Sequence, residues 1–285
     1  MSNTLYLLVG GEATRLKPLS EGIPKALLTV KDIPIIDLIL NNLEDTNFDK
    51  FKLICSIKHQ EHWENYKIKC KFDIELLFEN EKLDTAGYMI QNINKFEESF
   101  FCMNGDLLLE MNFEKFLVHI ENAYNSTICS IQVEDPSRFG VLHLDRDKIV
   151  NFVEKPEDLK YGNNISMGLY FIIKKDILKI KDNLSIPTSF EKDVFPALAE
   201  NLLLDCYKVN GKMIDVGTVE SYIFAHTDGK NNWIGDNVAI GSNTNIKNSV
   251  VFKNCSIGSD VEISNSIIQK DKNIPNSTKI INEIY

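Results

Sequence analysis

Short hydrophobic runs alternate with amphipathic segments over the first 133 residues. The runs predict buried strands at residues 5–9, 51–57, 74–78, 100–103 and 127–133. Apolar positions that recur every three or four residues predict helices at 34–43, 61–66, 86–93 and 113–123. Strands separated by helical crossovers are typical of a doubly wound, Rossmann-like α/β sheet, here expected to be mixed but mainly parallel. Ligands bind such sheets outside the carboxyl ends of the strands.

The pattern becomes more mixed after residue 139. It predicts a hairpin from 140–144 and 149–153, strands at 167–173 and 202–209, and helices at 190–198 and 219–226. Among the earlier helices, Pro34 suits a first helical turn. The spacing then predicts one helix face made of Ile35, Leu38, Ile39 and Asn42, with Leu43 beside it.

The pattern changes again after His226. Aliphatic residues stand six positions apart, and the spacing resumes after one five-residue step: Ile234, Ile240, Ile246, then Val251, Ile257 and Ile263. This period predicts a short left-handed β-helix of hexapeptide repeats with about two to three coils. A polar tail with chance aliphatics is the alternative. So few coils are unstable alone, so we expect them to pack on the first domain or on another subunit in a homo-oligomer. The predicted domains are residues 1–228 and 229–285.

Composition and charge narrow the class of protein. The chain has 285 residues, 44% hydrophobic and 25% charged, which is ordinary for a globular protein. The net charge of −10 and the lack of a basic block argue against nucleic acid as a partner, but not against small anions. The six cysteines form no C-x-x-C pair, so we expect reduced thiols in a cytoplasmic protein. We expect no membrane span, because no apolar run reaches about 18 residues.

Candidate chemistry begins where the first predicted strand ends. Gly10 and Gly11 follow the strand, and Arg15 and Lys25 come soon after. Glycines let backbone N–H groups approach oxygens closely, and two cations neutralise phosphate charge, so the segment predicts a phosphate-binding loop. It is not a Walker loop. A turn with two solvated cations is the alternative.

Two aspartates follow apolar stretches in the same way. Asp106 comes after the strand at 100–103, and Asp215 comes after Met213 and Ile214. Carboxylates at the phosphate-binding edge suit Mg²⁺, which binds through one or two carboxylates plus substrate phosphates. An ordinary Gly-Asp turn is the alternative for Asp106, and a helix cap is the alternative for Asp215, although Thr218 is also a candidate N-cap. Lys155 is a third candidate phosphate cation, or else a surface lysine.

These motifs together resemble the sugar-1-phosphate nucleotidyltransferases, also called nucleotide-sugar pyrophosphorylases, and among them the mannose-1-phosphate guanylyltransferases. The family signature G-G-x-G-T-R-L-x-P-L-[ST] followed by P-K-x-L is met at residues 10–20 and 24–27. Further matching segments are L-D-T-A-G at 83–87, N-G-D at 104–106, F-G-V at 139–141, E-K-P at 154–156, S-F-E-K-D-V-F-P at 189–196 and D-V-G-T-V-E-S-Y at 215–222. The resemblance covers nearly the whole chain and implies the GT-A-like form of the Rossmann-like sheet, with residues 1–228 as the catalytic domain.

The reaction that the resemblance implies joins an NTP and a sugar 1-phosphate into an NDP-sugar and releases pyrophosphate. By the same resemblance, Arg15 holds the β and γ phosphates, and Lys25 holds the α-phosphate and the attacking phosphate. Asp106 and Asp215 are the implied ligands of Mg²⁺. Positioning and charge stabilisation would carry such a reaction without a protein nucleophile.

The resemblance also implies where the nucleotide and the sugar bind. The Gly10-Gly11 backbone faces the nucleotide, and the segment with Asp84 and Thr85 lies by the base. The implied sugar-phosphate site consists of Gly140, Glu154, Lys155 and Gly168, in which Lys155 binds the phosphate and Glu154 binds sugar hydroxyls.

Three positions depart from the usual motifs: Ala13 and Asp84 each replace a glycine, and Ser166-Met167-Gly168 replaces Asn-Ala-Gly. A methyl group at position 13 is tolerable if its φ is negative. Glu79 is a hypothetical acceptor for the N1–H and N2–H₂ of guanine. Within the resemblance, GTP with mannose 1-phosphate is the first expected substrate pair, followed by glucose 1-phosphate with dTTP or UTP.

Two other functions are alternatives. A catalytically silent regulatory subunit would keep the fold but lose phosphate cations or metal aspartates, and all five of these charged residues are present here: Arg15, Lys25, Asp106, Lys155 and Asp215. A hexapeptide acyltransferase usually needs more coils and a histidine between them, and no histidine follows His226.

Overall fold

The computed structural model describes residues 3–285, which divide into two compact units. Unit 1 consists of residues 3–10, 40–105 and 109–213. Unit 2 consists of residues 11–39, 106–108 and 214–285. Each unit is therefore assembled from stretches far apart in sequence, and each is described by itself below.

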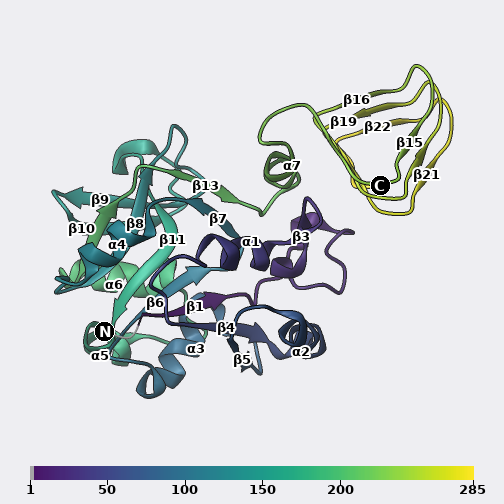
Figure 1. Ribbon diagram of the computed structural model, residues 1–285. Helices are drawn as coiled ribbons and strands as arrows, with labels where there is room; N and C mark the ends of the chain where they lie inside the picture. Colours follow the sequence, from purple (N-terminus) through teal and green to yellow (C-terminus); the bar gives the residue numbers. More distant parts are fainter. Residues whose placement is uncertain (1–2) are drawn as a thin grey trace. The chain divides into compact units, whose positions relative to one another are not determined.

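Unit 1 is built on a mixed sheet in which, within the described residues, nine strands follow the order β5-β4-β1-β6-β11-β8-β12-β10-β9 (Figure 1). In chain order the strands are β1 (Thr4–Leu8), β4 (Lys50–Ser56), β5 (Ile74–Glu79), β6 (Ser99–Asn104), β8 (Ser126–Gln132), β9 (Gly140–Asp145), β10 (Lys148–Glu154), β11 (Asn164–Ile173) and β12 (Leu204–Lys208). β5, β4, β1 and β6 run parallel, whereas β11 is antiparallel to both β6 and β8. The predicted mixed α/β sheet is confirmed: β5, β4, β1 and β6 form a parallel half, and β12 is parallel to β8 in the other half.

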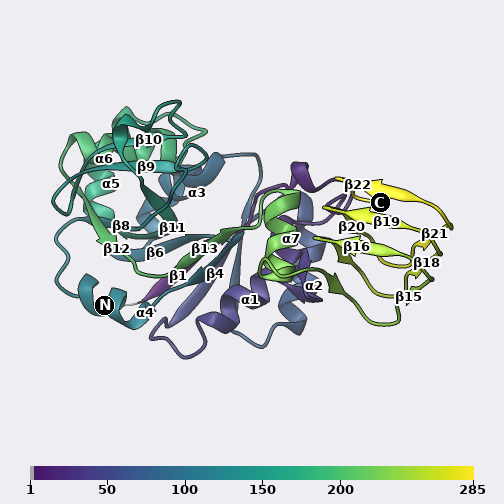
Figure 2. The ribbon, with the colours of Figure 1, turned by 90° about the horizontal axis from the view of Figure 1, so that it is seen from above.

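The helices of unit 1 are α2 (Gln60–Lys69), α3 (Asp84–Asn92), α4 (Phe113–Ile120), α5 (Lys174–Ile180) and α6 (Phe195–Glu200), with a π-helical turn at Phe190–Val194. Figure 2 shows these helices from above. Aromatic side chains are prominent in the core of unit 1. Tyr6 stacks on Phe96 with ring centroids 4.4 Å apart, and Phe190 stacks on Phe195 at 5.3 Å. Such rings bury large apolar areas, so they stabilise the sheet that carries the candidate residues.

The structure changes some local predictions. Pro34 lies in β3 (Ile33–Pro34), which pairs with β2 (Thr29–Val30), so α1 begins one residue later and spans Ile35–Asn42. The buried residues of α1 are Ile35, Ile36, Ile39 and Leu40, whereas Asn42 is exposed. The helix is thus rotated from the predicted face. The pattern also missed β7 (Leu107–Glu110) and β13 (Lys212–Asp215), which pair with each other.

The tail of unit 2 is a stack of short parallel strands, as the period of six predicted (Figure 1). Within the described residues three coils are present, and equivalent positions are 17 residues apart. The strands are β14 (Trp233–Ile234), β15 (Ala239–Ile240), β16 (Asn245–Lys247), β17 (Val250–Val251), β18 (Ser256–Ile257), β19 (Glu262–Ser264), β20 (Ile267–Ile268), β21 (Asn273–Ile274) and β22 (Lys279–Ile281). They form the three faces β14-β17-β20, β15-β18-β21 and β16-β19-β22.

The corners of the coils explain why asparagine and aspartate are so frequent in the tail. The corner residues all have a positive φ, between 45° and 61°: Asn237, Asn243, Asn248, Asn254, Asp260, Asn265, Asp271, Ser277 and Asn282. Asparagine and aspartate tolerate this left-handed backbone better than most residues. Their side chains also bond between coils, as where Asn254 donates to Asp271 Oδ1 at 3.0 Å. The polar punctuation is therefore a requirement of the corners.

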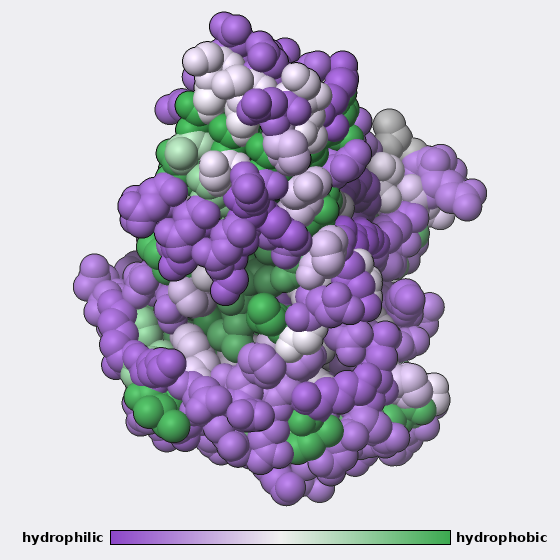
Figure 3. Space-filling model, turned by 90° about the vertical axis from the view of Figure 1, so that its right-hand side faces the viewer, coloured by the Kyte–Doolittle hydropathy of each residue, from purple (hydrophilic) through white to green (hydrophobic). Residues whose placement is uncertain are grey.

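Hydrophobic side chains reach the surface in limited areas. The face drawn in Figure 3 is mostly hydrophilic, and hydrophobic residues gather there in separate patches, one of them in a hollow. None of the helices in residues 3–285 is long and apolar enough to cross a membrane.

The helix before the coils, α7 (Val219–Thr227), carries a buried histidine. The Nδ1 of His226 lies 2.9 Å from the carbonyl oxygen of Tyr222, and its ring packs against Trp233 and Phe252. Burial, with the charge of Lys31 adding to it, lowers the pKa of His226 to about 4. The neutral ring is therefore the form that the folded protein accommodates.

This histidine predicts an acid-sensitive fold. The unfolded chain takes up the proton near the ordinary pKa of about 6.5, so it binds more protons than the folded protein between pH 6.5 and 4. The contribution of His226 to the free energy of unfolding is therefore fully present above pH 6.5. It is lost as the pH falls from 6.5 to 4, and the loss is roughly 2 to 3 kcal/mol. We expect His226→Phe to remove that part of the slope in chemical denaturation measured from pH 4.5 to 7.5. An unchanged slope would contradict the assignment.

Candidate active site

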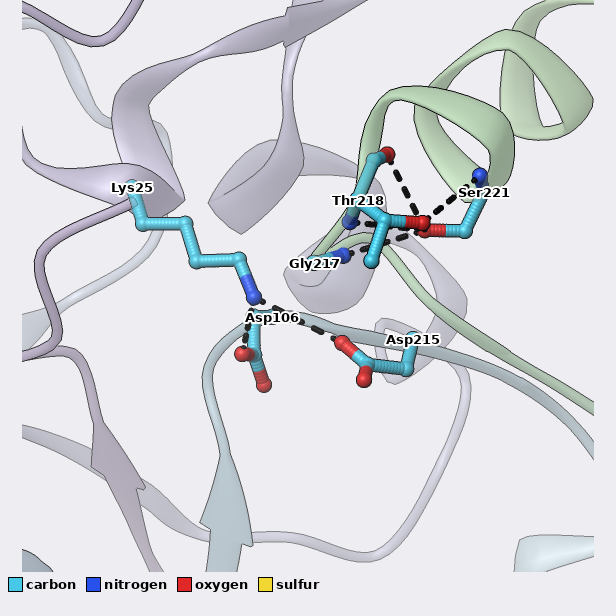
Figure 4. A network of polar contacts seen from close by, with 6 residues as sticks. All are labelled: Lys25, Asp106, Asp215, Gly217, Thr218 and Ser221. Carbon is cyan, nitrogen blue, oxygen red and sulfur yellow. Dashed lines mark hydrogen bonds and ion pairs between the residues drawn. The ribbon is translucent and has the colours of Figure 1, made fainter. Parts of the chain in front are cut away.

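Three charged residues predicted from separate motifs meet in unit 2. Lys25 begins a 3₁₀ turn, Lys25–Leu27, after Pro24; Asp106 follows β6 through Gly105; and Asp215 ends β13. The ammonium group of Lys25 donates to Asp106 Oδ2 and lies 3.5 Å from Asp215 Oδ1 (Figure 4). The Lys25 side chain is 13% exposed, against 31% for Asp106 and 40% for Asp215. A largely buried cation thus joins two partly exposed carboxylates.

The backbone holds the two aspartates in place. The N–H of Val216 donates to the carbonyl oxygen of Asp106 at 3.0 Å, which links the segments that carry Asp106 and Asp215. A Cβ on Gly217 would lie only 2.8 Å from Asp215 Oδ1, so a side chain at position 217 would displace that carboxylate.

The helix cap resolves the alternative role of Asp215. The hydroxyl of Thr218 accepts from the N–H of Ser221 at 3.2 Å, and the hydroxyl of Ser221 accepts from the N–H of Thr218 at 3.0 Å (Figure 4). This capping box is the N-terminus of α7. Thr218 is therefore the cap, as predicted, and the carboxylate of Asp215 faces Lys25 instead.

The arrangement fits a divalent cation by its donor set. Two carboxylates converge on one positive charge, and carboxylate oxygens are the ligands that Mg²⁺ prefers. In the described part of the chain, no group of three or more His, Cys, Asp or Glu residues could hold a metal by itself. Asp106 and Asp215 therefore suit an ion whose remaining ligands come from a phosphate substrate and water.

The glycine loop has the backbone that the sequence required. Ala13 has a φ of −78° and is buried, so its methyl group is tolerated, as expected. Its carbonyl oxygen accepts from the hydroxyl of Ser20 at 2.6 Å, which holds the loop closed. Arg15 lies in the next 3₁₀ turn with an exposed side chain, and a Cβ on Gly11 would meet no atom within 4 Å. This stretch of unit 2 is open to a ligand.

The candidate base-binding residues lie in unit 1. Glu79 ends β5, and burial, with the charge of Asp84 as a second cause, raises its pKa to about 7. A Cβ on Gly10 would lie 3.0 Å from Glu79 Oε2, so glycine at position 10 makes room for this carboxylate. Asp84 has a φ of +65°, a left-handed conformation that favours glycine. Aspartate adopts this left-handed conformation more readily than most residues other than glycine, so the turn is kept with Asp84 in place of the motif's glycine.

Thr85 is placed in a network that the sequence did not reveal. Its hydroxyl donates to Glu191 Oε2 at 2.7 Å and accepts from the N–H of Phe190 at 2.8 Å. Ser189 donates to the same carboxylate oxygen at 2.8 Å. Thr85 therefore ties the start of α3 to the π-helical turn, and Glu191 is a structural partner that the S-F-E-K-D-V-F-P segment contained without an assigned role.

The candidate sugar-phosphate residues also belong to unit 1. Gly140 and Glu154 are paired across β9 and β10, and the carboxylate of Glu154 lies 2.7 Å from the ammonium group of Lys155. A Cβ on Gly140 would collide with the Phe152 ring at 2.3 Å, so packing alone requires that glycine. Gly168 has a φ of +68° within the irregular part of β11. The structure thus brings Gly140, Glu154 and Lys155 together.

Comparison with known proteins agrees with these motifs. A family model described as nucleotidyl transferase matches residues 6–232, and one described as the GlmU-like C-terminal hexapeptide matches residues 203–283. The catalytic subunit beta of mannose-1-phosphate guanylyltransferase from Drosophila pseudoobscura pseudoobscura is 32% identical over 225 residues, which are 76% of this chain and 60% of the relative. A mannose-1-phosphate guanyltransferase from Gibberella zeae is 33% identical over 228 residues, 76% of this chain and 61% of the relative.

A solved structure extends the similarity to the fold. HddC from Yersinia pseudotuberculosis, complexed with GMP-PN, superimposes with a TM-score of 0.65 at 27% identity, over 78% of this chain and 97% of that one. The chain spans about 60% of the length of the two curated relatives. Because the first family model covers most of the sequence and the predicted motifs fall within it, the chain belongs to the nucleotidyl transferase family.

Proposed function

We propose that this protein transfers a nucleotidyl group from an NTP to a sugar 1-phosphate, giving an NDP-sugar and pyrophosphate. The observation that carries the proposal is the convergence of Asp106 and Asp215 on the ammonium group of Lys25. A phosphoryl-type transfer needs placed positive charge and a metal site more than it needs a protein nucleophile. Family membership and the names of the relatives support the same reaction.

In the proposed reaction a phosphate oxygen of the sugar 1-phosphate attacks the α-phosphorus of the NTP, and the bond to the β-phosphate oxygen breaks. Lys25 is placed to neutralise charge on the α-phosphate and on the attacking phosphate, since its side chain is 13% exposed and its ammonium group is held between carboxylates. The exposed Arg15 binds the β and γ phosphates, which leave as pyrophosphate. Both cations orient the reactants and stabilise charge that grows in the transition state.

Mg²⁺ is the proposed cofactor, held by Asp106 and Asp215. When bound, it would supply Lewis-acid stabilisation of the transferring phosphate. The hydrogen bond from the N–H of Val216 to the carbonyl oxygen of Asp106 links the two segments, and Gly217 leaves room for the Asp215 carboxylate.

The proposed substrates are GTP and mannose 1-phosphate, with glucose 1-phosphate and dTTP or UTP as the next pair. The two curated relatives are named for mannose 1-phosphate and the guanylyl group, and the HddC structure holds GMP-PN. Glu79, Asp84 and Thr85 are the proposed base-side residues, together with the Gly10-Gly11 backbone. Glu154 and Lys155 are the proposed sugar-side pair, with Gly140 and Gly168 in the pocket wall.

The direct test is pyrophosphate release from a panel of NTPs and sugar 1-phosphates, with Mg²⁺ and with EDTA. We expect turnover with at least one pair, highest for GTP with mannose 1-phosphate, and loss of turnover with EDTA. Turnover that survives EDTA would contradict the cofactor. The absence of turnover with every pair would contradict the reaction and favour a regulatory subunit of the same fold.

Glu79 gives the base preference a specific prediction. A carboxylate accepts both the N1–H and the N2–H₂ of guanine, whereas a glutamine amide offers one acceptor and an opposing donor. We expect Glu79→Gln to lower the preference for GTP over UTP in kcat/KM by at least about tenfold. Because the acceptor form is the ionised one and its pKa is about 7, GTP preference in the unsubstituted protein should rise from pH 6 to 8.

The control for this variant is Glu75→Gln, which changes an exposed glutamate on the same strand, β5. It should leave both the preference and its pH dependence unchanged. If Glu79→Gln keeps the same preference for GTP, Glu79 does not contact the base.

Self-association and a cytoplasmic location complete the proposal. Ile234 and Ile240 in the first coil are 40% and 47% exposed. Their equivalents in the later coils are buried: Val251 and Ile268 for Ile234, and Ile257 and Ile274 for Ile240. This apolar coil supports a homo-oligomer, and a monomer at all concentrations in light scattering would contradict it. Buried free thiols such as Cys102 and Cys129 are typical of the reducing cytoplasm.

A further inference from the structure

A cavity of about 430 Å³ lies within unit 2, beside residues 18–32, the segment that follows the glycine loop. Its walls combine that loop with α7 and the coils. Apolar side chains dominate the lining, among them Pro18, Leu28, Tyr222 and Phe252. Tyr222 is fully buried and its hydroxyl donates to the carbonyl oxygen of Thr29, so the wall is fixed in place. The volume is in the range of sites for small organic molecules.

Two lysines line the same cavity from successive coils. Lys253 and Lys270 are 17 residues apart, which is the coil period, so they occupy equivalent positions on neighbouring coils. Neighbouring strands lie about 4.8 Å apart, so the two side chains start close together. Within the described residues neither lysine forms an ion pair, whereas Lys279 in the last coil pairs with Glu262 at 2.8 Å. Adjacent like charges repel, and a bound anion would remove that repulsion.

We propose that this cavity binds a small phosphate ester whose body is flat or apolar. The phosphate lies against Lys253 and Lys270, and the body packs on Leu28 and Phe252. Glu21 and Asp32, which also line the cavity, are acceptors for donor groups on the ligand. None of the lining residues belongs to the set that meets around Lys25, so this site is distinct from the candidate active site.

The loop connects the two sites. Leu27 lines the cavity, and it lies in the same 3₁₀ turn as Lys25, whose ammonium group holds Asp106 and Asp215. A ligand that packs against Leu27 restrains this turn, and with it the backbone that carries Lys25. Occupancy of the cavity therefore changes the rate of the proposed reaction. This regulatory part rests on the proposed function, whereas the binding itself does not.

The binding test uses phenyl phosphate, the simplest ester of this class, in isothermal titration with the full chain. For a ligand of this size we expect a Kd of about 1–10 mM. Binding should weaken at least about tenfold in the double variant Lys253→Glu/Lys270→Glu. The matched control is Lys230→Glu/Lys247→Glu, which changes the charge of unit 2 equally at two exposed lysines outside the cavity and should bind as the unsubstituted protein does. Equal weakening in both double variants would overturn the site.

A crystal soaked with 4-bromophenyl phosphate locates the ligand. We expect an anomalous bromine peak beside Leu28 and Phe252. Bromine only beside Asp106 and Asp215, or no peak at saturating ligand, would overturn the proposal. With saturating substrates, phenyl phosphate should then change the turnover rate of the control variant Lys230→Glu/Lys247→Glu. It should not change the turnover rate of Lys253→Glu/Lys270→Glu. Binding in the cavity with no turnover under any condition would leave this site standing and contradict the proposed reaction instead.

Discussion

Asp106→Asn is expected to lower kcat for pyrophosphate release by at least about 1000-fold while the protein stays folded. The substitution keeps the shape of the side chain but removes one of the two carboxylates that face Lys25. Loss of a metal ligand removes several kcal/mol of transition-state stabilisation, and a 1000-fold loss corresponds to about 4 kcal/mol. Circular dichroism and thermal unfolding check the fold, because Asp106 is partly exposed and its replacement costs only about 1 kcal/mol of stability.

Two further variants make this test decisive. Asp215→Asn should cause a loss of the same order, since its carboxylate faces the same ammonium group at 3.5 Å. Asp182→Asn, at an exposed position in unit 1, should leave kcat unchanged. If Asp106→Asn keeps more than a tenth of the activity, the assignment of Asp106 to the cofactor is wrong.

The parts of the site that the sequence predicted share one local signal. Asp106 and Asp215 each follow an apolar stretch, and Lys25 lies in the segment that continues the glycine loop. Chain segments that leave a sheet at one edge tend to gather there. The same logic predicted Thr218 as a helix cap, because a hydroxyl directly before an amphipathic run satisfies orphan N–H groups. The coils were predictable because one aliphatic per short strand leaves a period of six.

The parts that the sequence did not predict depend on contacts between distant segments. No local pattern indicates that Lys25 would bridge two carboxylates located 81 and 190 positions later. The bond from Thr85 to Glu191 spans 106 positions, and the pairing of β7 with β13 joins two four-residue strands that are too short for a periodic signal. The rotation of α1 has a similar cause, because its apolar residues are dense enough to allow two faces and only packing selects one.

Backbone conformation is a second feature that the sequence indicates only indirectly. Asp84 replaces the expected glycine, and the sequence alone left its effect on base binding open. Its φ of +65° shows that the turn is retained, and the carboxylate then adds a charge that helps to raise the pKa of Glu79. A departure from the motif therefore changes the electrostatics of the candidate base site without changing its backbone.

Lys25→Met is expected to raise the affinity for Mg²⁺ in the absence of substrates while it abolishes turnover. The ammonium group now neutralises Asp106 and Asp215, so a divalent cation must compete with it. Without the ammonium group, the two negative charges of Asp106 and Asp215 face each other, which favours a bound cation and destabilises the cation-free protein. The measurement is the increase in the free energy of unfolding caused by 10 mM Mg²⁺. This increase should be about 1.4 kcal/mol if Kd falls to about 1 mM, but about 0.4 kcal/mol or less if Kd stays near 10 mM.

Matched variants separate this effect from general destabilisation. Lys25→Arg keeps the positive charge, so its response to Mg²⁺ should resemble that of the unsubstituted protein. Lys17→Met removes an exposed lysine from the same loop and should change neither the response nor turnover. An equal response to Mg²⁺ in Lys25→Met and Lys17→Met would show that Lys25 does not share its carboxylates with the cofactor. The metal would then be held elsewhere, and the role of Lys25 would be confined to the substrate phosphates.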